Sequence, residues 1–82
     1  MTVLIKPIMT EKAVRMIETE NKILFIVERK ARKEEIKQEF ETIFENKIKS
    51  INVYIRKNQK IAIIKLKEAS AALNVATKLG LM

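Results

Sequence analysis

The chain has 82 residues, of which 17 are lysine or arginine and 10 are glutamate, which gives a formal net charge of +7. It contains no histidine, cysteine, tryptophan or aspartate, so disulfides, thiolate metal sites and histidine acid–base chemistry are excluded. A small basic chain attracts polyanions. We therefore expect a nucleic-acid partner, no cofactor, no metal and no enzymatic activity.

The length suits one domain over residues 1–82, with a modest core. The longest apolar runs hold about five residues, far below the roughly 20 that cross a bilayer, and the N-terminus lacks a signal-peptide core. We expect a cytoplasmic protein with no membrane insertion.

The first elements are short. The β-branched stretch from Thr2 to Ile5 stops before Lys6-Pro7 and predicts an edge strand. Thr10 is a suitable N-cap for a helix from Glu11 to about Glu18, and residues 20–22 form a turn. The five apolar residues 23–27 then predict a central strand that is covered on both faces.

A longer helix is predicted from about Arg32 to Glu45. Its apolar stripe consists of Ile36, Phe40, Ile43 and Phe44, and charged residues fill the other face. No Ser, Thr, Asn or Asp is placed to cap its start, so Glu34 and Glu35 are expected to compensate through the helix dipole.

Residues 48–56 and 60–67 predict a hairpin. Pairing residues whose numbers sum to 117 puts Ile55/Ala62, Val53/Ile64 and Ile51/Leu66 on one face, and Arg56/Ile61, Tyr54/Ile63, Asn52/Lys65 and Ser50/Lys67 on a mixed face. A final helix is predicted from about Glu68 to Leu79; it carries the apolar residues Ala69, Ala72, Leu73, Ala76 and Leu79, with Gly80 as its left-handed C′ residue. The fold class is α+β, a ferredoxin-like antiparallel four-stranded sheet covered by helices in the order β-α-β-α-β-β-α.

Basic residues form three sets. The first surrounds the start of the first helix, the second precedes the long helix, and the third lines the hairpin: these are Lys6, Lys12 and Arg15; Arg29, Lys30, Arg32 and Lys33; and Arg56, Lys57, Lys60, Lys65 and Lys67. The alternative for each set is an ordinary solvated surface, and for Lys65 and Lys67 a lysine-protected edge strand.

Acidic and aromatic residues offer less. The glutamates of residues 34–45 are interpreted as solvated charge on a helix face, not as a metal site. Phe25, Phe40 and Phe44 fit the core and Tyr54 stands alone, so single-strand base stacking is disfavoured. Recognition of phosphate and sugar in a folded RNA or a duplex remains.

Several segments together resemble a known family. They are Pro7-Ile8-Met9-Thr10-Glu11-Lys12, Asn21-Lys22 before Phe25 and Val27, Lys33 to Ile36-Lys37, Ile51-Asn52-Val53, residues 60–66 and residues 72–80. In order and spacing they resemble the L-twenty-three family of large-subunit ribosomal proteins, in its archaeal and eukaryotic branch. The resemblance covers essentially the whole chain.

The resemblance implies a structural protein of the large ribosomal subunit that binds rRNA beside the exit of the polypeptide tunnel, among neighbouring ribosomal proteins. It places rRNA contacts at Lys6, Thr10, Lys12, Lys30, Arg32, Lys33, Arg56, Lys57 and Lys60. Arg15, Arg29 and Lys65, which belong to the three basic sets, complete the list of twelve predicted RNA-binding residues.

Glu11 matches the family's exposed glutamate at a factor-docking surface, and the docked factor of an archaeal-type member would be signal recognition particle or the translocon. The short hairpin implies that no segment lines the tunnel interior. The chain departs from the family pattern at two positions. Arg32 stands where Ser or Thr is usual, so a side-chain cap of the long helix is not expected. Ile61 follows Lys60 where a second basic residue is common, which weakens one expected rRNA contact. The alternatives are a free-standing nucleic-acid-binding regulatory domain and, more remotely, a small phosphatase on the same type of sheet.

Overall fold

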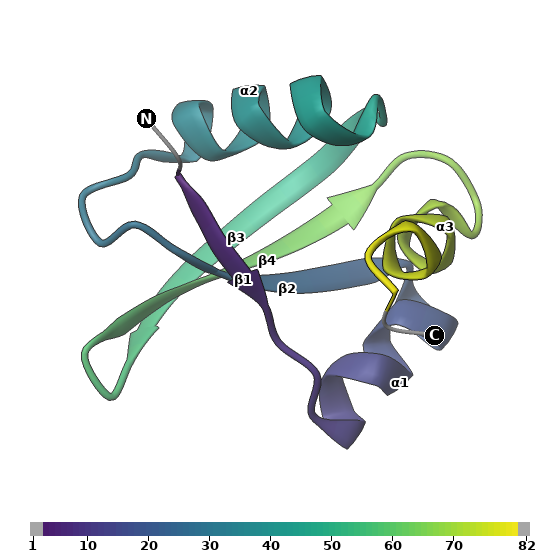
Figure 1. Ribbon diagram of the computed structural model, residues 1–82, viewed down its shortest axis with the longest axis horizontal. Coiled ribbons are helices and arrows are strands. Elements are labelled where there is room, and N and C mark those ends of the chain that lie inside the picture. Colours follow the sequence, from purple (N-terminus) through teal and green to yellow (C-terminus); the bar gives the residue numbers. More distant parts are fainter. Residues whose placement is uncertain (1–2, 81–82) are drawn as a thin grey trace.

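The computed structural model describes residues 3–80, which form one four-stranded sheet and three helices. The elements in chain order are β1 (Leu4–Pro7), α1 (Glu11–Glu20), β2 (Lys22–Val27), α2 (Lys33–Phe44), β3 (Ile48–Arg56), β4 (Gln59–Leu66) and α3 (Ala71–Lys78). All neighbouring strands are antiparallel, and their order across the sheet is β1-β2-β4-β3 (Figure 1). The predicted α+β class and the predicted order of elements are confirmed.

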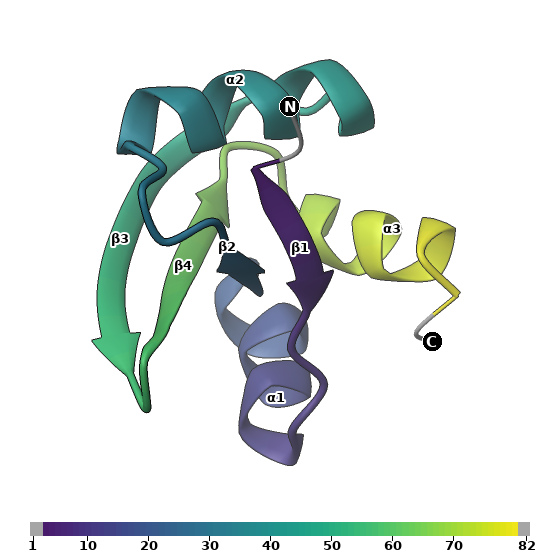
Figure 2. The ribbon, with the colours of Figure 1, turned by 60° about the vertical axis from the view of Figure 1, so that its left-hand side comes forward.

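The main core lies between one face of the sheet and the apolar sides of α2 and α3. The Phe25 ring on β2 lies 6.0 Å from the Phe40 ring and 6.1 Å from the Phe44 ring of α2, measured between centroids. Small residues of α3, among them Ala72 and Val75, are fully buried in the same cluster. Figure 2 shows α2 and α1 near opposite ends of β1, with α3 to one side.

A smaller cluster lies on the opposite face of the sheet. It joins Ala13 of α1 to Leu24 of β2 and Ile61 of β4, with Met16 and Ile63 partly buried around it. The main core meanwhile holds the alternate β2 residues, as the two-residue period of a strand requires. The prediction that β2 is central and covered on both faces is confirmed.

The edge position of β1 is confirmed, but the strand was predicted to end at Ile5, two residues before its observed end at Pro7. The strand continues through Pro7, which lacks an N–H, and the next residue resumes the ladder because Ile8 N donates to Leu24 O at 2.9 Å. A proline is tolerated here because an edge strand has few partners to lose. Thr2 lies outside the described residues.

The predicted hairpin register is wrong by two residues. Lys57 and Asn58 both adopt left-handed backbone angles, with φ of 50° and 65°, and alone make the turn. Tyr54 therefore pairs with Ile61, and Val53 pairs with Ala62. Because a shift of two preserves the alternation of a strand, every side chain keeps its predicted face even though its partner changes.

The helix ends also differ from prediction. Helix α1 continues to Glu20, and α3 begins at Ala71 instead of Glu68, because Ser70 has a left-handed φ of 63° that breaks the helical path. Of the predicted apolar stripes, Ile43 on α2 is 55% exposed, and Ala69 and Leu73 are also exposed. Gly80 has a φ of +74°, which confirms its predicted left-handed conformation.

Candidate nucleic-acid interface

The predicted RNA-binding residues lie mostly on the surface. Ten of the twelve are exposed, and only Lys60 and Lys65 are half-buried. Within residues 3–80 the single ion pair joins Lys22 Nζ to Glu20 Oε1 at 3.2 Å, so none of the twelve is neutralised by a carboxylate there. The positive charge is therefore available to an external anion.

The fold brings the second basic set and three residues of the third set, Arg56, Lys57 and Lys60, to the same end of the sheet. Strand β2 ends where β4 begins, because Val27 pairs with Lys60. Lys60 Nζ also donates a hydrogen bond to Ala31 O, which ties the loop before α2 to the base of the hairpin. We call this region the hairpin end, and it carries six exposed cations: Arg29, Lys30, Arg32, Lys33, Arg56 and Lys57.

Part of the hairpin end is the start of α2. Arg32 is the N-cap and its side chain caps no N–H, as the sequence predicted. Instead, Glu35 accepts a hydrogen bond from Arg32 N at 3.0 Å, which is one half of a capping box. The remaining free N–H groups and the adjacent cations make this turn favourable for a phosphate.

The first basic set and the adjacent Thr10 divide between two surfaces. Thr10 and Lys12 lie with Arg56 and Lys57 around a groove of about 650 Å³ on the sheet face opposite α2 and α3. Lys6 shares this face, because it pairs with Ile26, which lines the groove. We call this hollow the open-face groove.

Arg15 of the first set and the neighbouring Thr10 have other positions or structural roles. Arg15 lies outside the open-face groove and lines a separate shallow hollow with Glu11. Thr10 is the N-cap of α1, where its Oγ1 accepts a hydrogen bond from Ala13 N at 3.2 Å. Thr10 thus has a structural role that its capping position already predicted.

Lys65 is separated from the other predicted contacts. It pairs with Lys22 and Ser50 at the far end of β4, five residues from Lys60 and therefore about 17 Å away along the strand. The alternative interpretation of Lys65 as protection for an edge strand is wrong, because β4 lies between β2 and β3. The nearby Lys67 follows the same strand and belongs to this far end too.

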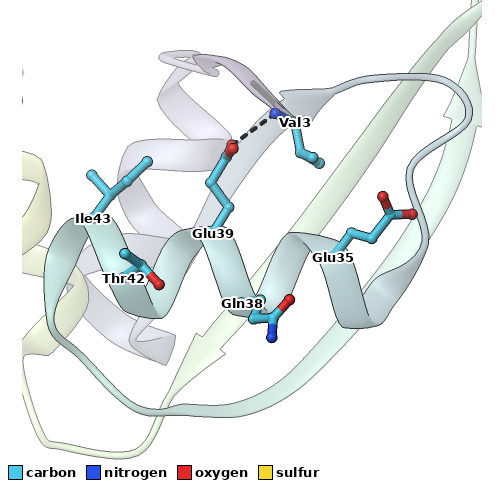
Figure 3. Close-up of a pocket in the computed structure, with 6 residues that line it drawn as sticks. All are labelled: Val3, Glu35, Gln38, Glu39, Thr42 and Ile43. Carbon is cyan, nitrogen blue, oxygen red and sulfur yellow. Dashed lines mark hydrogen bonds between the residues drawn. The ribbon is translucent and has the colours of Figure 1, made fainter. Parts of the chain in front are cut away.

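The acids of α2 are not simply solvated charge. Glu39 Oε2 accepts hydrogen bonds from Val3 N at 2.8 Å and Leu4 N at 2.6 Å, and Glu41 Oε2 accepts one from Ile48 N at 3.0 Å. Figure 3 shows Glu39 reaching Val3 from the helix, in a shallow pocket that Ile43 of the same helix also lines. These carboxylates hold backbone groups at the sheet edges, which the sequence pattern could not reveal.

Other kinds of site find no support in residues 3–80. No group of three or more potential metal ligands comes together there. Across the same residues, every helix is too short or too polar to cross a bilayer.

The position of Tyr54 in a surface groove was not predicted from the sequence. The three phenylalanines are buried in the main core as predicted, whereas Tyr54 is 38% exposed and lines the open-face groove. Its position beside Ile61 and Ile63 on the mixed face of the hairpin was the available signal. The groove itself could not be predicted, because its other wall comes from α1.

Comparison with known proteins agrees with the resemblance seen in the sequence. The family model described as Ribosomal protein L23 matches residues 2–74. Among curated relatives, the large ribosomal subunit protein uL23 of Picrophilus torridus is 46% identical over 81 residues, covering 99% of both chains.

Two further relatives have the same description. The protein of Methanosphaera stadtmanae is 41% identical and covers 96% of this chain and 93% of its own length. That of Methanococcus vannielii is 45% identical and covers 92% and 88%. The chain therefore belongs to the ribosomal protein L23 family, and it is a non-enzymatic, cytoplasmic protein of the large ribosomal subunit, as its sequence predicted.

Proposed function

We propose that this protein binds rRNA through the hairpin end and the rim of the open-face groove, beside the exit of the polypeptide tunnel. The observation that carries the proposal is the gathering of exposed cations from three separate chain segments, none of which has a carboxylate partner within residues 3–80. Charges of one sign that are held together in this way repel one another, and RNA phosphates relieve that repulsion.

The shape of the surface indicates how RNA is bound. The loop before α2 lies on the helix side of the hairpin end, and Lys12, Arg56 and Lys57 lie around the groove on the other face. RNA segments that converge at this end of the sheet would each meet a cationic surface. The two-residue turn keeps the hairpin short, so its tip supplies phosphate contacts and does not extend into the tunnel interior.

Charge reversal tests the rRNA contact. We expect the triple variant Lys30→Glu, Arg32→Glu, Lys33→Glu to lose binding to large-subunit rRNA while keeping its fold, because all three side chains are exposed. The matched control is Lys47→Glu, Lys49→Glu, Lys67→Glu, which changes the net charge equally with exposed residues at the far end of the sheet. Equal loss in both variants would reduce the interaction to net charge and refute the assigned surface.

We also propose that the start of α1 offers a docking surface for factors that meet the nascent chain, such as signal recognition particle or the translocon. Glu11 is the exposed first residue of α1, and the neighbouring Met9 is 38% exposed. An acid beside an accessible apolar side chain provides both charge and contact area for a partner protein.

Binding of the purified factor to ribosomes that carry Glu11→Gln tests this surface. The control is Glu34→Gln, because Glu34 is also an exposed acid in the first turn of a helix. Weaker factor binding for the Glu11 variant alone supports docking at α1. Unchanged binding, or equal losses in both variants, would leave Glu11 as a residue that only complements the helix dipole.

A further inference from the structure

The open-face groove combines an apolar floor with a cationic rim. Strands β2 and β4 supply Leu24, Ile26, Ile61 and Ile63 to the lining, and α1 supplies Ala13 and Met16. The volume of about 650 Å³ lies within the range of roughly 300 to 1,000 Å³ that is typical of small-ligand sites. A nucleotide fits a space of this size, and a nucleic-acid duplex does not.

Tyr54 gives the groove an aromatic surface. It is 38% exposed, whereas Phe25, Phe40 and Phe44 are buried and pack against one another in the main core. The chain contains no tryptophan and no second tyrosine. Stacking of a nucleobase on an aromatic side chain of this protein is therefore possible at this one position.

The charge of the groove favours a nucleotide over an apolar protein segment. Lys12, Arg56 and Lys57 are among its lining residues, and no carboxylate is. None of the three cations forms an ion pair within residues 3–80. An unpaired nucleotide has a flat apolar base for the floor and phosphates on both sides for the rim, so it complements both parts of the groove.

We propose that the open-face groove receives a single unstacked nucleotide of the bound RNA, with its base against Tyr54 and its flanking phosphates beside Lys12, Arg56 and Lys57. The inference rests on the proposed rRNA binding and adds a mode of recognition that phosphate contacts alone do not provide. A base extruded from a loop or bulge fixes the position of the protein along the RNA, because only one nucleotide can occupy the groove.

Ultraviolet crosslinking of intact large subunits tests the occupant. Trypsin cleaves after Lys49 and after Arg56, so Tyr54 is the single aromatic residue of the peptide that spans residues 50–56. After digestion of RNA and protein, we expect mass spectrometry to find a nucleotide adduct on this peptide. RNA adducts confined to other peptides of the chain would overturn the groove proposal and leave rRNA binding intact, whereas no RNA adduct on any peptide would overturn both. A crosslink from Tyr54 to another protein would also overturn the proposal that a nucleotide occupies the groove.

Substitution of Tyr54 provides the second measurement. We expect Tyr54→Leu to weaken rRNA binding roughly five- to a hundredfold, from the stacking contribution of one base, and Tyr54→Phe to bind within about twofold of the natural chain. Thermal unfolding of each variant identifies any loss of fold. Equal affinity of a folded Tyr54→Leu variant would refute stacking in the groove.

Discussion

Replacement of Asn21 by alanine should destabilise the fold by an unusually large amount for a half-buried polar residue. Asn21 ends α1 with a left-handed φ of 56°. Its Nδ2 donates to Leu66 O at 3.0 Å and to Glu68 O at 2.6 Å, and its Oδ1 accepts from Ala72 N at 2.8 Å. One side chain thus joins the end of α1, the end of β4 and the first turn of α3.

The expected loss follows from these contacts. The two part-buried bonds, to Leu66 O and from Ala72 N, contribute about 1 kcal/mol each, and the bond to Glu68 O adds little because water can replace it at the surface. A left-handed alanine costs about 1 kcal/mol more. We expect Asn21→Ala to lower the free energy of unfolding by about 3 kcal/mol, which corresponds to a fall in Tm of roughly 12 to 24 °C for a domain of this size.

Two variants separate the contributions in thermal or urea unfolding. Asn58→Ala places alanine at a left-handed φ of 65° in an exposed turn, so it should show the backbone cost alone, about 1 kcal/mol. Asn21→Gly removes the side-chain bonds without the backbone strain and should lie between the two. If Asn21→Ala and Asn58→Ala lose equal stability, the assigned role of the Asn21 amide is refuted.

Three other predictions concern charge. Glu39→Ala should lower the free energy of unfolding by about 2 kcal/mol, because two backbone N–H groups at the start of β1 lose their acceptor, whereas Glu34→Ala should change it by less than about 0.5 kcal/mol. Raising the salt concentration should weaken rRNA binding steeply. The unfolding temperature of the free chain should stay unchanged or rise, because salt screens the repulsion between its like charges. A fall in the unfolding temperature together with the affinity would contradict the charge assignment. Lys57→Gln should weaken rRNA binding and reduce its salt dependence by about one phosphate contact, whereas Lys65→Gln at the far end should do neither in the same filter-binding assay.

The sequence predicted the elements well because their signals are local. The spacing of Ile36, Phe40 and Phe44 follows the helical period, and the five apolar residues of β2 are typical of a strand that is buried on both faces. Gly80 was recognised as a helix end for a similar reason, because the left-handed region favours glycine.

The errors arose where backbone angles without a clear sequence signal, or contacts between distant residues, decide the outcome. The hairpin register depends on left-handed angles at Lys57 and Asn58, and lysine gives no local signal for such an angle. The late start of α3 follows from the left-handed Ser70, and the first turn of the helix is held by Asn21, whose Oδ1 accepts a hydrogen bond from Ala72 N from 51 residues earlier in the chain. The same limit applies to the site, because the groove joins Ala13 of α1 to Tyr54 of the hairpin, which lies 41 residues later in the chain.

Several glutamates of this basic chain stabilise the fold by accepting backbone hydrogen bonds, and they form no ion pair with a cation within residues 3–80. Glu35, Glu39 and Glu41 bind backbone N–H groups at the start of α2, at β1 and at β3, instead of pairing with lysine or arginine. Had these acids formed surface ion pairs, each would have added little stability, about 0 to 1 kcal/mol, and would have neutralised a cation. Used as backbone acceptors, they fasten helix and strand ends and leave the hairpin end positive. These three glutamates therefore serve the fold, and the formal net charge of +7 remains for the proposed RNA interface.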